Sequence, residues 1–168
     1  MNYDLNALKG RRVFVDANAF LYYFQGISPL AREVFRYGAE NQLKLSTTTR
    51  IMDEVIHKNL LIQARNVFGW KSKTIHRLRQ EPEKMKRLVP EVERVFQLAA
   101  SIRLEMEVIR PTDLSKMPKM MAEHGLLGSD SLVLIVMNRL NLKFLLSSDS
   151  DFDRVSWVER IPCDPDLA

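Results

Sequence analysis

GSDSLVLIVMNRLNLKFLLSSDSDFDRV, residues 128–155, contains the clearest structural pattern in this chain. Its first half is strongly apolar and predicts a buried helix from Asp130 to Arg139. Residues 143–147 then form a short apolar segment, which is typical of a buried strand. That strand runs directly into an acidic loop at 148–151. A buried helix followed by a strand that ends in a polar loop is typical of α/β proteins.

The rest of the chain continues this alternation of strands and helices. Pro90 predicts a break or a fresh first turn, because an interior proline removes a helical hydrogen bond. Alternating elements predict a parallel sheet with helices on both faces, in one α/β domain over residues 1–168. Strands are expected at 13–15, 43–46 and 104–110, with a weak one near 157, and helices at 20–24, 29–40 (with Ser28 as its cap), 51–64, 82–100 and 114–124.

The composition is that of an ordinary globular protein, with 46% hydrophobic and 27% charged residues. No apolar run approaches the roughly 18 residues that a membrane span needs. The N-terminal residues contain no apolar signal segment, so we expect a cytoplasmic protein that does not enter a membrane.

Cysteine and histidine offer little chemistry in this sequence. Cys163 is the single cysteine, and it falls in a polar stretch. We interpret it as an incidental residue rather than a catalytic thiol. His57, His76 and His124 are scattered without metal-ligand spacing, which argues against a zinc site.

Positive charge is concentrated in one segment. Residues 71–87 contain seven basic residues and two acids, which gives +5 there and leaves −1 for the rest of the chain. Such a patch suits the binding of a polyanion such as RNA, although a solvated pair of helices would look the same. The basic residues are Lys71, Lys73, Arg77, Arg79, Lys84, Lys86 and Arg87.

Four acids stand at positions where a parallel sheet would gather them. Asp16 and Asp149 follow predicted strands, Asp130 begins a helix, and Glu54 shares a helix face with apolar residues. Asp16 and Asp130 could instead cap helices, and Asp149 could form a turn with Asp151. Glu54 could instead be a surface acid like its neighbour Asp53. Together they predict a site for a hard cation, Mg²⁺ or Mn²⁺, of the kind that activates water against a phosphodiester.

These motifs resemble the PIN domain family. VFVDANAFLYYF resembles its opening strand and helix, STTTRIMDEVIHK its second motif, and residues 128–155 its third and fourth motifs. The resemblance implies a three-layer α/β/α sandwich with a central parallel sheet. This chain departs from the family in a region over 66–103 that is expected to be extended and helical. It also implies RNA hydrolysis that leaves a 5′-phosphate and a 3′-hydroxyl.

The resemblance assigns roles to particular residues. Asp53 is a rival to Glu54, and Glu54 is preferred on register. Asn18 and Ser147 would support the site, and Asp151 would be a fifth acid with a less constant role. The metal-binding and catalytic acids would be Asp16, Glu54, Asp130 and Asp149.

Short PIN proteins most often resemble VapC, the toxin of a toxin–antitoxin pair. This implies a homodimer, a protein antitoxin and a structured RNA target such as a tRNA or rRNA loop. Tyr22, Tyr23 and Phe24 would give either protein partner an apolar surface, or else pack in the core.

Other functions remain open. A PIN nuclease of RNA processing would use the same chemistry, and a non-catalytic RNA-binding module would keep the fold. The four acids argue against the module, because they would repel RNA. A phosphatase of the haloacid dehalogenase type needs an Asp where this chain has Asn18, and is set aside.

Overall fold

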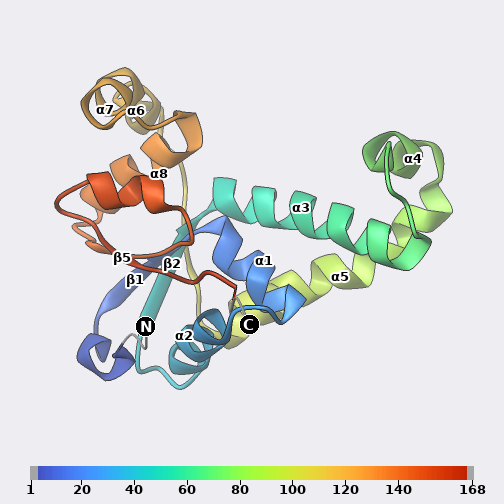
Figure 1. The fold of residues 1–168 in the computed structure, drawn as a ribbon, viewed down its shortest axis with the longest axis horizontal. Coiled ribbons are helices and arrows are strands. Elements are labelled where there is room, and N and C mark those ends of the chain that lie inside the picture. Colours follow the sequence, from blue (N-terminus) through green and yellow to red (C-terminus); the bar gives the residue numbers. More distant parts are fainter. Residues whose placement is uncertain (1–3, 166–168) are drawn as a thin grey trace.

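The computed structural model describes residues 4–165, in which a five-stranded sheet lies between helices (Figure 1). The strand order is β3-β2-β1-β4-β5, and every neighbouring pair is parallel. All strands therefore end at one edge of the sheet, which we call the carboxyl edge. The predicted parallel sheet with flanking helices is confirmed. The strands are β1 (Arg12–Val15), β2 (Lys44–Thr48), β3 (Glu105–Glu107), β4 (Phe144–Leu146) and β5 (Glu159–Ile161).

Helices connect these strands and cover the sheet. They are α1 (Ala17–Gln25), α2 (Pro29–Ala39), α3 (Thr49–Phe68), α4 (Thr74–Gln80), α5 (Pro82–Ser101), α6 (Pro111–Leu114), α7 (Met117–His124) and α8 (Gly128–Arg139), with short 3₁₀ turns η1 (Leu5–Leu8) and η2 (Ser150–Arg154). No single helix within residues 4–165 is long and apolar enough to cross a membrane, and Pro111–His124 with Gly128–Arg139 reach that length only as a pair bent by 106°.

The central strands are buried on both faces. In β1, Val13, Phe14 and Val15 have no exposed surface, and Leu145 and Leu146 of β4 have none either. This burial explains why both strands are continuous apolar runs rather than alternating ones. The aromatic run that follows β1, Tyr22 to Phe24, is half-buried and packs against the same core.

Polar side chains cap the first turns of two helices, of which Ser28 was predicted from the sequence. Ser28 Oγ accepts a hydrogen bond from the Ala31 amide at 3.1 Å, and Pro29 is the first residue of α2. Of the three consecutive threonines, Thr48 caps α3 by accepting from the Ile51 amide. Thr48 is also the last residue of β2, so the carboxyl end of this strand leads directly into α3.

Several expected boundaries were wrong. Helix α1 begins at Ala17 rather than 20, because Asp16 caps it, and α8 begins at Gly128, before Asp130. Helix α5 continues through Pro90, since its packing against α3 compensates for one lost hydrogen bond. Strand β3 stops at Glu107, beyond which Arg139 Nη2 donates to the Val108 carbonyl.

A helical arm projects from the sheet. Helices α3 and α5 lie side by side and extend away from the strands, with α4 at the tip (Figure 1). We call residues 60–90 the arm. It has a small apolar cluster of its own, made by Ala64, Trp70, Leu78 and Leu88. The extended helical region expected over 66–103 therefore exists, including α4, which sequence periodicity did not reveal.

Candidate metal-binding site at the carboxyl edge

Asp16 and Ser147 are brought together by strand pairing. Val15 at the end of β1 pairs with Leu146 at the end of β4, so the residues that follow lie side by side. Ser147 Oγ donates to Asp16 Oδ2 at 2.8 Å, and Asn18 Nδ2 donates to the same oxygen at 3.0 Å. The Ala17 amide donates to Asp16 Oδ1 at 2.7 Å. Three donors therefore fix the orientation of this carboxylate.

Asn18 connects this carboxylate to the loop after β4. Its Oδ1 accepts from the Ser148 amide at 3.2 Å and lies 3.6 Å from Cys163 Sγ. Cys163 is fully buried, although the sequence around it indicated a polar stretch. Burial, together with the negative charge of Asp16, raises the pKa of the thiol to about 12, which keeps it protonated at neutral pH.

All four predicted acids line one pocket of about 220 Å³. Asp16 follows β1, Glu54 lies in the second turn of α3, and Asp130 lies in the first turn of α8. Asp149 follows β4, and its Oδ1 accepts from the Asp151 amide at 2.8 Å. The pocket thus draws its acids from four separate parts of the chain.

Burial and mutual repulsion raise the pKa of two of these acids. The pKa of Asp16 is raised to about 6, mainly by burial and to a smaller extent by the charges of Asp130 and Glu54, against the lowering effect of its hydrogen bonds. Burial and the charge of Asp149 likewise raise the pKa of Asp130. A compensating positive charge in the pocket would relieve both effects.

Two basic residues of α3 line the same pocket, and sequence analysis missed them. Lys58 Nζ contacts Glu54 Oε1 at 2.6 Å, and Arg50 contacts Asp53 at 3.4 Å. Their spacing of four residues on either side of Glu54 places all three on one helix face, a signal that the sequence contains. Asp53 has an 80% exposed side chain and does not line the pocket.

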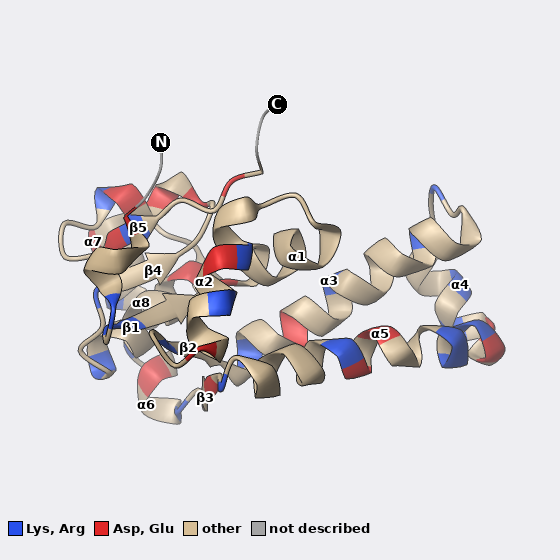
Figure 2. Ribbon diagram, turned by 90° about the horizontal axis from the view of Figure 1, so that it is seen from below, with Lys and Arg blue, Asp and Glu red and all other residues tan. Residues whose placement is uncertain are grey.

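Other predicted site residues lie elsewhere. Asp151 is not among the pocket residues; it is exposed and pairs with Arg154 at 2.6 Å. The basic segment 71–87 lies at the tip of the arm, where Figure 2 shows Lys and Arg gathered around α4 and the start of α5. Fourteen residues of α3 separate Glu54 from Phe68, a rise of about 21 Å. The structure does not bring this basic segment to the acids.

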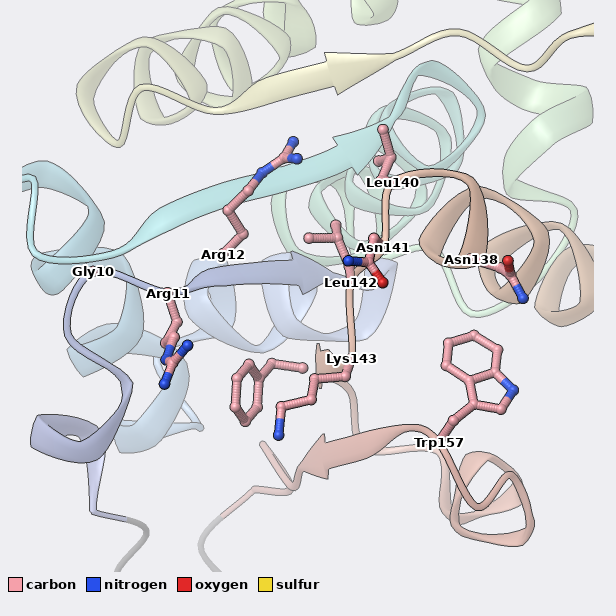
Figure 3. Close-up of a pocket in the computed structure, with 10 residues that line it drawn as sticks. Gly10, Arg11, Arg12, Asn138, Leu140, Asn141, Leu142, Lys143 and Trp157 are labelled. Atoms are coloured by element: carbon pink, nitrogen blue, oxygen red, sulfur yellow. The ribbon is translucent and has the colours of Figure 1, made fainter.

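The donor chemistry of the pocket fits a hard cation. Its acidic side chains offer only oxygen ligands, which select Mg²⁺ or Mn²⁺ over softer metals. As the side chains stand, no three Asp, Glu, His or Cys groups within residues 4–165 converge into a ligand set for one ion. A larger hollow, of about 650 Å³, lies at the opposite edge of the sheet and contains none of these acids (Figure 3).

Known proteins share this fold. The family model described as "PIN domain" matches residues 13–158. A search of curated protein sequences found no match. Among solved structures, a chain from the crystal structure of VapBC2 from Rickettsia felis, bound to a DNA fragment from their promoter, is similar with a TM-score of 0.52 and 14% identity. The alignment covers 91% of the present chain and 99% of that chain, which establishes a shared fold.

Proposed function

Because the chain belongs to the PIN domain family, we propose that it is a metal-dependent endoribonuclease acting at the carboxylate pocket. Proteins with this domain are generally nucleases. The observation that carries the proposal is the convergence of four acids from four parts of the chain on one pocket. The acids are Asp16, Glu54, Asp130 and Asp149.

In this proposal the four acids hold Mg²⁺ or Mn²⁺. When bound, such ions supply an activated water and neutralise charge on the phosphate that is attacked. Ser147 and Asn18 keep the Asp16 carboxylate oriented through their hydrogen bonds to Oδ2. Arg50 and Lys58 add positive charge at the same pocket, where they would contact the RNA backbone.

The arm would grip RNA away from the cleaved bond. Arg77 and Lys84 lie over the Trp70 ring, at 5.5 and 4.8 Å from its centre, which holds these cations in place. Lys71, Lys73 and Arg79 make no ion pair with any residue of 4–165. An RNA that reached both the pocket and the arm tip would have to span at least about 21 Å.

We assign the protein to the VapC-like toxins, with a protein antitoxin as partner. The likeness to a VapBC2 chain supports this, and so does Leu127, which is 75% exposed beside the pocket residues Ser129 and Asp130. An antitoxin that covered Leu127 would also close the pocket. We propose a homodimer as well, since Val89 and Phe96 leave apolar surface exposed on α5. A processing nuclease would share the chemistry and lack the antitoxin gene next to its own.

The test is cleavage of a labelled structured RNA with Mg²⁺ or Mn²⁺, beside a reaction in EDTA. Glu54→Gln and Asp16→Asn should each reduce cleavage at least roughly a hundredfold, because each removes a pocket carboxylate. Asp53→Asn is the matched control, since Asp53 neighbours Glu54 but does not line the pocket. Equal cleavage by wild type and Asp16→Asn would overturn the proposal. RNA binding without cleavage by either protein would favour the non-catalytic module.

A further inference from the structure

The amino edge of the sheet contains a hollow unrelated to the carboxylate pocket. Its volume is about 650 Å³, which is within the usual range for small-molecule sites. Residues just before β1 and β4 line it, together with the end of α8 and the segment before β5. Figure 3 shows Arg11 on one side of the hollow, Trp157 on the other and Lys143 between them.

The lining of this hollow is basic. It includes Arg11, Arg12 and Lys143, and no Asp or Glu is among its lining residues within the described part of the chain. Arg12 and Lys143 pair with Glu105 and Glu159, which lie outside the hollow. Both pairs are at least partly exposed to solvent, so exchanging the glutamate for another anion costs little. Arg11 has no ion-pair partner among residues 4–165. The hollow therefore favours an anionic ligand.

The remaining lining favours a ligand that also has an aromatic ring. Trp157 is half-buried, so part of its indole is free to stack against a planar ring. Asn138 and Asn141 are exposed at the same hollow and offer amide donors and acceptors. Nucleotides combine a phosphate, a planar base and polar edges, and they match this lining.

We propose that this hollow binds a nucleotide, with its base against Trp157 and its phosphate near Arg11 and Lys143. The nucleotide is either free or part of an RNA chain. The site is separate from the carboxylate pocket and does not depend on cleavage there, because the two lie at opposite edges of the sheet.

Tryptophan fluorescence tests this proposal. The chain has two tryptophans, and Trp70→Phe in the arm leaves Trp157 as the sole reporter. In EDTA, AMP, UMP, a short single-stranded RNA and inorganic phosphate are each titrated into this protein. We expect saturable quenching by a nucleotide or by the RNA. Arg11→Gln or Lys143→Gln should weaken binding roughly tenfold, because each removes a charged donor to the phosphate. Lys116→Gln is the matched control, because Lys116 is exposed and lies outside both the hollow and the arm.

The outcomes separate the possible ligands. Quenching by AMP or UMP identifies a site for free nucleotides, whereas quenching by RNA alone identifies a site for a nucleotide within a chain. Competition by inorganic phosphate that equals a nucleotide in strength would overturn the role of Trp157. Absence of quenching by any ligand, or equal quenching in Arg11→Gln and Lys143→Gln, would overturn the site. Asp16→Asn should bind these ligands as tightly as wild type, because Asp16 does not line the hollow. The result can therefore be interpreted even if the proposed nuclease activity is not found.

Discussion

Lys58 Nζ lies 2.6 Å from Glu54 Oε1, so one carboxylate of the pocket already binds a cation of the chain itself. A metal ion that used this oxygen would have to displace the ammonium group. We therefore expect Lys58→Gln to bind Mn²⁺ about two- to fivefold more tightly than wild type. An ion pair between helix residues four apart contributes a few tenths of a kcal/mol to stability, and somewhat more when it is partly buried. Calorimetry or the paramagnetic resonance of free Mn²⁺ measures the change.

Lys86→Gln is the control for Lys58→Gln. Lys86 pairs with Glu83 at 2.7 Å, but both are highly exposed at the arm, away from the pocket. Its loss should leave Mn²⁺ affinity unchanged. Weaker Mn²⁺ binding by Lys58→Gln would instead mean that Lys58 orders Glu54 for the ion rather than competing with it.

Asp16→Asn should stabilise the metal-free protein at neutral pH. The pKa of Asp16 is raised from 3.8 to about 6 in the folded state, so the folded chain binds this proton more tightly than the unfolded chain. Stability from this group is therefore lost as pH rises from about 4 to about 6, and the loss is constant above that. A pKa shift of about two units corresponds to at most about 3 kcal/mol in the free energy of unfolding. Removing this cost should raise the Tm of the variant by several degrees.

Thermal melts in EDTA between pH 4 and pH 8 measure this effect. The wild-type Tm should fall more steeply across pH 4–6 than that of Asp16→Asn. Asp53→Asn should follow the wild type, because its side chain is 80% exposed. If Asp16→Asn melts lower than wild type at pH 7.5, the hydrogen bonds from Ser147 and Asn18 outweigh the cost of burying the charge.

Much of the pocket was predictable because it depends on strand ends. Asp16 and Asp149 follow apolar strands, and parallel strands place their carboxyl ends at one edge. Glu54 could be preferred over Asp53 because the apolar positions of α3 fix which side of the helix faces inward. That the structure places these acids together does not test their roles in catalysis, which stay predictions.

The parts that sequence reasoning missed depend on long-range packing. Apart from Ile161, the residues next to Cys163 are Pro and Asp, yet the chain after β5 packs near Asn18 and buries the thiol. The first turn of α8 is similar, because Leu127 rather than a polar cap precedes Gly128. Helix α4 also escaped detection, since its apolar residues pack on a small cluster in the arm rather than on the main core.

Cys163 should be inert in the native protein. Its side chain is fully buried and its pKa is raised to about 12, so almost no thiolate is present at pH 8. We expect a thiol reagent at pH 8 to label the unfolded chain quickly and the native protein very slowly. Cys163→Ala should keep RNA cleavage, at a stability cost of about 1 kcal/mol for the lost packing. Rapid native labelling would show that this segment opens readily, and lost cleavage in a stable Cys163→Ala protein would mean that the thiol positions Asn18.

Neutralising the arm should weaken RNA binding without affecting the pocket. Lys71, Lys73 and Arg79 are exposed, so changing all three to Gln removes three charges with little effect on folding. If each contacts one phosphate, the slope of log K against log salt should fall by roughly 0.7 to 0.9 for each lost contact. Binding of RNA is measured from 50 to 200 mM salt in the Asp16→Asn background, which separates affinity from cleavage.

A control triple variant of Arg32, Lys116 and Lys119 removes the same charge from exposed positions elsewhere. Equal slopes for the two triple variants would mean that overall charge, rather than the arm, holds the RNA.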